Sequence, residues 1–279
     1  VIAFILTVVV CFLFILSGRK TWEANMLSLD LTGRIALVTG ATGQLGRVMA
    51  RTLATCGADV ALHFHGNRAK AETLADEIRA MGRRAAVVQA DVGSQSEVRA
   101  MAAAVDAALG APDIVVANAV SQYKWTTVLE QDPADYEDQF RSCVLQGVHL
   151  AKAFIPAMQE KGYGRFIGIN TECTMVMAPT QSAYVAGKRG MDGVYRVLAR
   201  EVGPSGITVN QVAPGWTISD RDREEGTEIS ASYSANVPLR RRGTDQEIAN
   251  VVAFLASDLS SFITGAFIPV AGGAVMPTV

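Results

Sequence analysis

The sequence of 279 residues predicts an α/β fold, a doubly wound parallel sheet of about seven strands in a single domain. Short apolar runs alternate with longer helical patterns from Leu29 onward, and repeated strand–helix units of this kind require right-handed crossovers between parallel strands. The strand candidates are also apolar at both odd and even positions, which is typical of parallel strands that helices cover on two faces. Hydrophobic residues make up 49% of the chain, so one large core can be buried.

Strands and helices are expected in strict alternation. The strands, rich in Val, Ile and Ala, are expected at Ile35–Val38, Val60–Phe64, Ala85–Gln89, Ile114–Ala117, Phe166–Ile169, Thr208–Val212 and Phe267–Val270. The helices are expected at Leu45–Thr55, Ala69–Met81, Glu97–Leu109, Asp135–Lys161, Ala183–Val202 and Gln246–Ala256. Two helix starts have the spacing of a capping box, Ser94-x-x-Glu97 and Thr244-x-x-Glu247. No internal repeat or linker divides the chain further, so residues 26–279 are expected to form one domain.

Charge and composition exclude several classes of partner. The formal net charge is only −2 and no basic tract is interleaved with aromatic residues, so no nucleic-acid partner is expected. The run Arg240–Arg242 is interpreted as a solvated or ion-paired face, with an anion site as the alternative. The four cysteines are widely scattered and the three histidines do not complete a metal-ligand spacing. A reduced, metal-free, cytoplasmic protein is therefore expected.

The first 25 residues form an apolar N-terminal extension. Val1–Leu16 as a helix would span ~24 Å, just short of a hydrocarbon core of ~30 Å. A signal peptide would carry a basic region before the apolar run, and none is present. Two interpretations stay open. In one, residues 1–25 result from an incorrectly assigned translation start, because the segment that begins at Met26 reads naturally as the first residues of a domain. In the other, they are a membrane anchor whose Arg19-Lys20 pair keeps the domain cytoplasmic.

A glycine-rich turn follows the first expected strand. Residues 39–46 read TGATGQLG and lead directly into a helix. Glycines at such a turn let the backbone approach a pyrophosphate, and the start of the helix supplies amides and positive potential. The turn therefore predicts a dinucleotide site, with a purely structural tight turn as the alternative.

The end of the second expected strand favours NADP over NAD. A site for NAD usually carries a carboxylate there, whereas residues 63–68 read HFHGNR and Asp59 lies at the opposite end of the strand. Asn67 and Arg68 could instead receive the 2′-phosphate of NADP, and NAD stays possible. His63 and His65 alternate along the strand, so one of them is expected to face outward and to need no special role.

Tyr184 and Lys188 are the main candidates for chemistry. They lie four residues apart and therefore on one face of a helix. A phenol has a pKa of about 10, and a nearby ammonium is expected to lower it so that the group can transfer protons near neutral pH. An isolated pair with this spacing would be a surface tyrosine and lysine. Its position after the fifth strand of a nucleotide-binding sheet favours the catalytic interpretation.

Together these motifs resemble the classical short-chain dehydrogenase/reductase family, with its Rossmann fold, over about Leu29 to Gly273. Within the family the sequence is similar to 3-oxoacyl-acyl-carrier-protein reductases and to pteridine reductases. The resemblance extends to Asp91-Val92 after the third strand, Asn118-Ala119 after the fourth, and the segments VNQVAPG (209–215) and FLASDLSSFITG (254–265).

The resemblance implies a role for each matched position. Tyr184 would protonate a carbonyl oxygen as hydride arrives at carbon, Thr171 stands where the family has its catalytic serine, and Lys188 would hold the nicotinamide ribose. The implied cofactor contacts are Gly40, Thr42, Leu45 and Gly46 at the pyrophosphate and ribose, Asp91 and Val92 at the adenine, Asn118 and Ala119 beside the adenosine ribose, and Pro214 and Gly215 at the carboxamide. A homo-oligomer, tetramer or dimer, is implied through the helices 135–161 and 183–202.

Several positions depart from the family pattern. Val144 stands where an asparagine supports a proton relay, so the relay is expected to be slower or rerouted through Gln146 or Glu172. Gln44 replaces the middle glycine of the turn, Val120 a glycine and Ala271 an aspartate.

The segment Trp216–Val237 is expected to be a mobile lid over the cofactor. Trp216 itself either packs on substrate or anchors the lid. Cys173 is expected to be a buried structural thiol rather than a reactive one.

Three hypotheses about function follow. The first is an NADP-preferring oxidoreductase that transfers hydride between the cofactor and a ketone or secondary alcohol. Its substrate would be a small molecule or an acyl chain. The second is a catalytically weak dinucleotide-binding sensor or scaffold, motivated by Val144, Thr171 and Gln44. The third is a membrane-tethered reductase of lipid or sterol-like ketones, motivated by Val1–Leu16.

Overall fold

The computed structural model describes residues 29–277, which fold around one parallel sheet. The order of its seven strands is β3-β2-β1-β4-β5-β6-β7. The strands are β1 (Ile35–Val38), β2 (Asp59–Phe64), β3 (Ala85–Gln89), β4 (Ile114–Ala117), β5 (Gly164–Ile169), β6 (Ile207–Pro214) and β7 (Phe267–Val270). The chain reverses its direction of travel across the sheet between β1 and β4, and ligands of such folds bind at the carboxyl ends of the strands near this point. The predicted doubly wound fold is confirmed.

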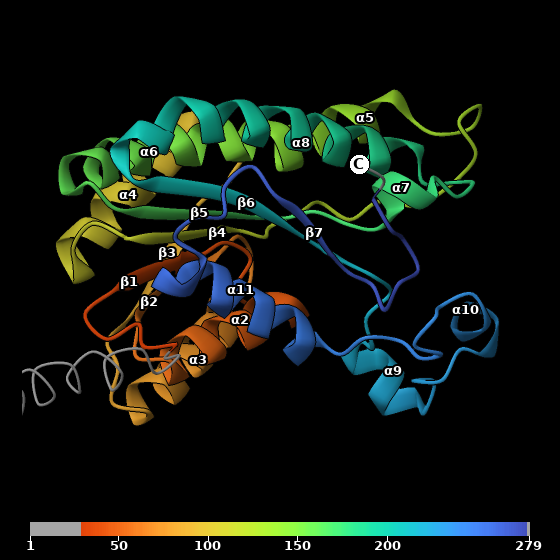
Figure 1. The fold of residues 1–279 in the computed structure, drawn as a ribbon, viewed down its shortest axis with the longest axis horizontal. Coiled ribbons are helices and arrows are strands. Elements are labelled where there is room, and N and C mark those ends of the chain that lie inside the picture. The colour runs from red at the N-terminus through yellow and green to blue at the C-terminus, as the bar shows by residue number, and fades with distance from the viewer. Residues whose placement is uncertain (1–28, 278–279) are drawn as a thin grey trace, which may run out of the picture.

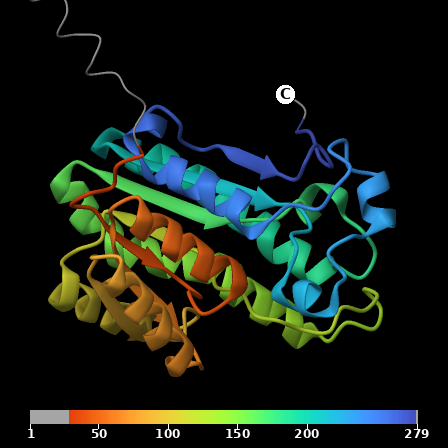
Figure 2. The same cartoon turned by 90° about the horizontal axis from the view of Figure 1, so that it is seen from below.

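Helices cover both faces of the sheet. One face carries α2 (Gln44–Thr55), α3 (Arg68–Ala80) and α11 (Asp245–Ala256), which Figure 2 shows lying across it. The other carries α4 (Gln95–Leu109), α5 (Pro133–Gln139), α6 (Gln146–Lys161) and α8 (Ser182–Val202) (Figure 1). The short helices α7 (Cys173–Val176), α9 (Asp220–Glu225) and α10 (Ala231–Ala235) lie beyond the carboxyl ends of the strands (Figure 1).

Two apolar clusters hold these layers together, one on each face of the sheet. Val38 and Val116 pair across β1 and β4 and belong to the cluster under α2 and α11. Their neighbours Leu37 and Val115 also pair, and belong to the cluster under α4, α6 and α8. Successive side chains of a strand point to opposite faces, so both parities must be apolar when both faces are covered. This is the physical basis of the pattern seen in the sequence.

The expected continuous helix Asp135–Lys161 is wrong. The structure has α5, then a π-helical segment η2 (Phe140–Leu145), then α6. Asp132 caps α5 by accepting the amide hydrogen of Ala134. The apolar periodicity runs on through η2, so the sequence pattern does not reveal the change of hydrogen bonding. Short π-helical segments are frequent at functional sites, and this one contains Val144.

One of the two predicted capping boxes is confirmed. At α11 the Thr244 hydroxyl accepts from the Glu247 amide at 3.2 Å, and the Glu247 carboxylate accepts from the Thr244 amide at 2.8 Å. At α4 the Ser94 hydroxyl caps the helix, but the Glu97 carboxylate accepts from the amide of Asp91 at 2.7 Å instead. Glu97 therefore binds Asp91, the first residue of the turn that leads from β3 to α4, rather than completing a box.

The N-terminal extension, residues 1–25, lies outside the described residues, so its two interpretations stay as stated. Among the helices of residues 29–277, none combines the length and the apolar composition that crossing a bilayer requires.

Candidate active site

A cavity of about 550 Å³ opens at the carboxyl ends of β4, β5 and β6. Thr171 lines it from the end of β5 and Tyr184 from the first turn of α8. Aromatic side chains from two other segments, Trp125 before α5 and Trp216 after β6, complete much of its wall. The crossover from β5 into α8 therefore places the two residues with the predicted chemistry in one cavity.

Tyr184 is held through its backbone amide. Gln181 is the N-cap residue of α8, but its side chain makes no capping hydrogen bond. The backbone amide of Tyr184 instead donates to the Tyr123 hydroxyl at 2.8 Å. The Thr171 hydroxyl accepts from the Cys173 amide at 3.2 Å, and Thr171 lines the same cavity as Tyr184. The predicted proximity of Thr171 and Tyr184 is thus present in the unliganded chain.

Lys188 lies one turn further along α8 and is buried. Its ammonium donates to the carbonyl oxygen of Ile169 at 2.6 Å and lies 5.8 Å from the centroid of the Tyr184 ring. The side-chain Nδ2 of Asn170 donates to the backbone carbonyl oxygen of Lys188 at 3.1 Å, which links the end of β5 to the same turn of α8. Lys188 is therefore positioned by the strand end and sits behind Tyr184.

Burial raises the pKa of the Tyr184 phenol above its ordinary value, and the neighbouring Thr171 hydroxyl offsets this only in part. In the unliganded chain this desolvation outweighs the lowering of the pKa that Lys188 is expected to supply. The Lys188 ammonium is directed at the Ile169 carbonyl, and desolvation of the phenolate dominates.

Trp125 is a site residue that the sequence did not reveal. Its ring stacks on that of Tyr184, with centroids 5.9 Å apart and planes at 27°. The Tyr123 ring lies in the same loop and lines the same cavity, with its centroid 6.4 Å from that of Trp125. An aromatic pair two residues apart, shortly after the fourth strand, was the available signal.

Glu172 is a buried carboxyl directly beside Thr171. Its Oε1 accepts from the Tyr233 hydroxyl at 2.9 Å and from the Trp216 amide at 3.1 Å. Burial raises the pKa of this carboxyl, and raises that of the Tyr233 phenol to about 12. Trp216 packs edge-on against Tyr233 at 5.4 Å, and the Arg242 guanidinium lies 4.2 Å above its indole. Trp216 thus both anchors its segment and faces the cavity.

Gln146 does not reach the catalytic side chains, so the suggested relay through it is wrong. Its Oε1 accepts from the Thr39 hydroxyl at 2.7 Å, and its amide donates to the Ala119 carbonyl at 2.8 Å. It therefore joins the turns after β1 and β4. Val144 is buried against Gly190 of α8, where a methyl carbon on Gly190 would lie 2.8 Å from it.

The glycine-rich turn has the shape that a dinucleotide needs. Gly40 has a φ of +62°, and a Cβ on Gly46 would lie 2.2 Å from the Gly40 carbonyl oxygen. Gly43 caps α2 without a side-chain bond, and the first turn carries no acidic residue. An anionic pyrophosphate fits this helix start. The Thr39 hydroxyl, missed in the sequence, accepts from the amides of Asn118 and Ala119 at 2.8 and 3.0 Å.

A second cavity of about 290 Å³ lies beside this turn and suits the adenosine end of a dinucleotide. Asp91, Val92 and Ala119 line it, and these are three of the residues that the resemblance assigns to the adenosine half of the cofactor. Asn67 and Arg68 line neither cavity. Asn67 caps α3, while Arg68 pairs with Glu72 at 3.2 Å.

The remaining predicted cofactor contacts lie along the same edge. Thr42 is partly exposed on the turn, and Leu45 packs onto the cluster under α2. The Pro214 carbonyl accepts from the Glu172 amide, and a Cβ on Gly215 would lie 2.8 Å from the Tyr233 hydroxyl.

His63 has a role that the sequence did not suggest. It is buried, its Nδ1 accepts the amide hydrogen of Gly40 at 3.0 Å, and its Nε2 lies 3.0 Å from the Ala90 carbonyl oxygen. These partners assign the proton to Nε2. His65 is exposed, as expected for one of the pair.

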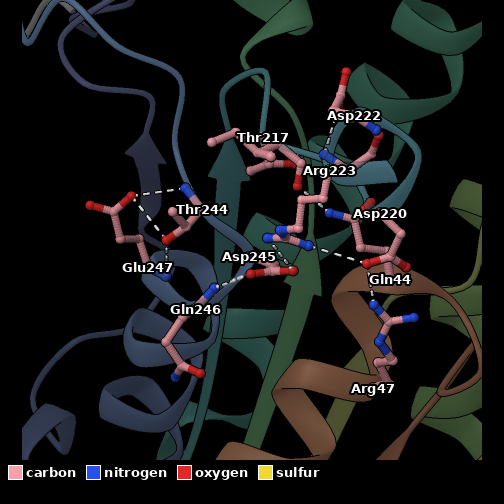
Figure 3. Close-up of polar contacts among 12 residues, drawn as sticks. Gln44, Arg47, Thr217, Asp220, Asp222, Arg223, Thr244, Asp245, Gln246 and Glu247 are labelled. Atoms are coloured by element: carbon pink, nitrogen blue, oxygen red, sulfur yellow. Dashed lines mark hydrogen bonds and ion pairs between the residues drawn. The ribbon is translucent and has the colours of Figure 1, made fainter. Parts of the chain in front are cut away.

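The segment after Trp216 is fastened to α2 by polar contacts (Figure 3). The Gln44 side chain donates to the Ile218 carbonyl at 2.5 Å, and Arg47 forms an ion pair with Asp220. Arg223 bridges Asp220 at 3.1 Å and Asp245 at 2.9 Å. The expected lid therefore contacts the start of α2. Gln44, which departs from the family pattern, makes one of these contacts.

The arginine run 240–242 is largely ion-paired, as predicted. Arg241 pairs with Glu247 at 2.6 Å. Arg242 is buried, pairs with Asp222 at 2.7 Å and donates to the Thr217 carbonyl at 2.8 Å. Both residues stabilise the lid and its junction with α11.

Comparisons with known proteins agree with this architecture. Residues 40–275 match the family model described as enoyl-(acyl carrier protein) reductase. The chain is 36% identical over 252 residues to the 3-oxoacyl-[acyl-carrier-protein] reductase FabG of Staphylococcus aureus, covering 86% of this chain and 98% of the relative.

Two solved structures are similar throughout. A gluconate 5-dehydrogenase from Burkholderia cenocepacia, in complex with NADP and tartrate, has a TM-score of 0.81 at 29% identity, covering 88% of this chain and 96% of the other. A 7α-hydroxysteroid dehydrogenase, complexed with NADH and 7-oxo glycochenodeoxycholic acid, has a TM-score of 0.80 at 29% identity and the same coverage. The chain therefore belongs to the short-chain dehydrogenase/reductase family and is a nicotinamide-dependent oxidoreductase that resembles 3-oxoacyl-acyl-carrier-protein reductases.

Proposed function

We propose that the chain is an NADP-preferring carbonyl reductase in which Tyr184 is the general acid, assisted by Thr171 and Lys188. The observation that carries the proposal is the presence of the Thr171 hydroxyl and the Tyr184 phenol in one cavity, with the Lys188 ammonium 5.8 Å from the centroid of the Tyr184 ring. Two hydroxyl groups that line one cavity can both donate a hydrogen bond to a single carbonyl oxygen.

The nicotinamide, when bound, supplies hydride to the carbonyl carbon. Tyr184 gives its phenolic proton to the carbonyl oxygen, so that C=O becomes CH–OH and a phenolate remains. The Lys188 ammonium, buried 5.8 Å from the ring centroid, stabilises this phenolate more than it would in water. Thr171 donates its hydroxyl hydrogen to the same oxygen and holds the carbonyl in place, its own oxygen being fixed by the Cys173 amide.

The cofactor preference rests on the end of β2. No carboxylate follows Phe64 there, and the exposed Arg68 guanidinium, 5.3 Å from the Phe64 ring centroid, offers a positive charge for a 2′-phosphate. The similar gluconate dehydrogenase binds NADP and the similar hydroxysteroid dehydrogenase binds NADH. These two structures therefore favour neither cofactor, and the proposed preference rests on the residues of this chain. The ketone can be a small molecule or an acyl chain, as in the 3-oxoacyl reductase relatives.

The test is oxidation of NADPH, followed at 340 nm, with a panel of ketones. Tyr184→Phe is expected to lower kcat by about 10³-fold, within the usual worth of a general acid. Tyr163→Phe is the matched control, because that ring lies against Arg34 and Arg165 outside the cavity. Full turnover by Tyr184→Phe would overturn the assigned mechanism. Equal kcat/KM with NADH would overturn the preference.

One observation supports a second candidate, a catalytically weak sensor or scaffold. Val144 is packed against Gly190 and offers no hydrogen bond at the place where the family has its relay asparagine. This candidate predicts saturable binding of NADPH with no turnover of any ketone in the panel.

A further inference from the structure

The polar lining of the larger cavity carries hydroxyl groups, the side-chain amides of Gln122 and Gln181, and one carboxyl group. Among the described residues that line it there is one carboxyl group, on Glu172, and no lysine, arginine or histidine. The Oε1 of Gln181, also in the lining, is buried and has no hydrogen-bond partner. A ligand that fills this space can satisfy such acceptors only by donating hydrogen bonds.

Glu172 has acceptor capacity to spare. Its Oε1 accepts hydrogen bonds from both the Tyr233 hydroxyl and the Trp216 backbone amide, while Oε2 accepts only a longer one, at 3.2 Å, from the same hydroxyl. An ionised carboxylate offers about four lone-pair sites. No ion pair joins Glu172 to a cation within residues 29–277, so its carboxylate, when ionised, lines the cavity without a counter-charge. A second negative charge brought into this site by a ligand would be repelled.

Two tryptophan rings line the same cavity. Trp125 is 44% exposed and comes from the loop before α5, while Trp216 is 50% exposed and follows β6. Figure 1 shows these two segments on different sides of the carboxyl ends of the strands, with α5 above and α9 and α10 below. Large indole surfaces left exposed within a cavity suit a ligand with a flat or cyclic face.

We propose that the substrate is an uncharged ring ketone that carries a hydroxyl group, and that Glu172 selects for it by accepting that hydroxyl hydrogen and repelling ketones that carry a carboxylate or phosphate. This inference rests on the proposed function, because the carbonyl must reach Thr171 and Tyr184 from within the same cavity. A volume of about 550 Å³ accommodates two or three fused rings.

Binding to the complex of protein with NADP⁺ tests the selection without turnover. The probes are 6-hydroxy-1-tetralone, its methyl ether and 6-carboxy-1-tetralone, titrated by calorimetry. The hydroxyl compound is expected to bind about tenfold more tightly than its methyl ether, since a hydrogen bond to a charged group is lost. The carboxylate compound is expected to bind at least about tenfold more weakly than the methyl ether.

Glu172→Gln isolates the charge. A glutamine oxygen can still accept from Tyr233 and Trp216, so the wall is expected to stay in place, which an unchanged melting temperature would verify. The variant is expected to bind the carboxylate compound within about threefold of the methyl ether. Glu160→Gln, on the exposed side of α6, is the matched control and should keep the full discrimination.

Equal binding of the carboxylate and hydroxyl compounds, or unchanged discrimination in Glu172→Gln, would overturn the inference. So would tighter binding of an acyclic acetoacetyl thioester than of the hydroxyl compound. Turnover is measured separately at 340 nm with NADPH. Selective binding with no turnover of any ketone overturns the proposed function and leaves the selectivity of the cavity established, whereas turnover without selectivity overturns this inference alone.

Discussion

The Nδ1 atom of His63 accepts the amide hydrogen of Gly40 at 3.0 Å and so ties the end of β2 to the glycine-rich turn. Its Nε2 contacts the Ala90 carbonyl oxygen, which extends the link to β3. The ring is buried, and burial lowers its pKa below the ordinary value of 6.5. Only the neutral imidazole can accept from Gly40, because both nitrogens of the cation are donors.

Acid should therefore destabilise the fold through His63. Its folded pKa is depressed, so its contribution to stability is fully present above about pH 6.5 and is lost as the pH falls below that value. We expect His63→Gln to reduce the free energy of unfolding by about 1–2 kcal/mol at pH 7.5, and the difference from wild type to shrink at pH 5.5. Urea unfolding at the two pH values measures it. His65→Gln, at an exposed position, should show neither effect, and a pH-independent gap for His63→Gln would contradict the assignment.

The phenol of Tyr184 should stay protonated in the cofactor-free protein. Burial raises its pKa, and the Lys188 ammonium does not compensate in this state. Ultraviolet difference titration of wild type against Tyr184→Phe should show no phenolate from this residue below about pH 10, the ordinary phenol value. A phenolate signal that appears between pH 7 and 9, and is absent from Tyr184→Phe, would mean that the lysine already lowers the pKa before any cofactor binds.

The sequence predicts those parts of the molecule that local pattern determines. The strands begin and end within about two residues of expectation because two-sided burial forces apolar residues at both parities, as in Ile114–Ala117. Tyr184 and Lys188 were found because helical spacing alone puts them on one face. Both properties can be read from neighbouring residues.

Contacts between distant segments could not be predicted in the same way. Glu172 meets Tyr233 across 61 residues, and Gln44 meets Ile218 across 174. Such pairs depend on how α9 and α10 fold back over the strand ends, which no periodicity encodes. The π-helical segment was missed for a related reason, since a single extra residue in a turn changes the hydrogen bonding without disturbing the apolar pattern.

The Arg47–Asp220 ion pair should slow the release of cofactor. It joins the lid to α2 one turn beyond the proposed pyrophosphate site, so the lid must detach before the cofactor can leave. Both side chains are partly exposed, and a screened pair of this kind contributes roughly 0.2–1 kcal/mol. We expect Asp220→Asn to raise the dissociation rate of NADPH about two- to fivefold at low salt, and less at high salt.

Stopped-flow fluorescence of NADPH measures that rate. Arg221→Ala is the control on the same helix, because its partner Glu225 also belongs to α9 and the pair does not join the lid to α2. Equal rates for wild type and Asp220→Asn at low salt would show that the pair does not limit release.

Glu247 should make α11 sensitive to acid. Its carboxylate accepts from the Thr244 amide at 2.8 Å and pairs with Arg241 at 2.6 Å, and these contacts lower its pKa to about 2. Because the folded pKa is depressed from 4.5, the stabilisation is present above pH 4.5 and is lost as the pH falls from there toward 2. The side chain is 37% exposed, so solvent screens the ion pair and most of the effect is the cap, about 1 kcal/mol.

Glu247→Gln should therefore lower the free energy of unfolding by about 1 kcal/mol at pH 7 and by much less near pH 3, because protonated glutamate loses the same charge that the substitution removes. Chemical unfolding followed by circular dichroism at both pH values measures the difference. Glu225→Gln is the control, since its exposed pair with Arg221 caps no helix and should change stability little. A loss that is equal at pH 7 and pH 3 would instead assign the role of Glu247 to packing of its side-chain stem and not to its charge.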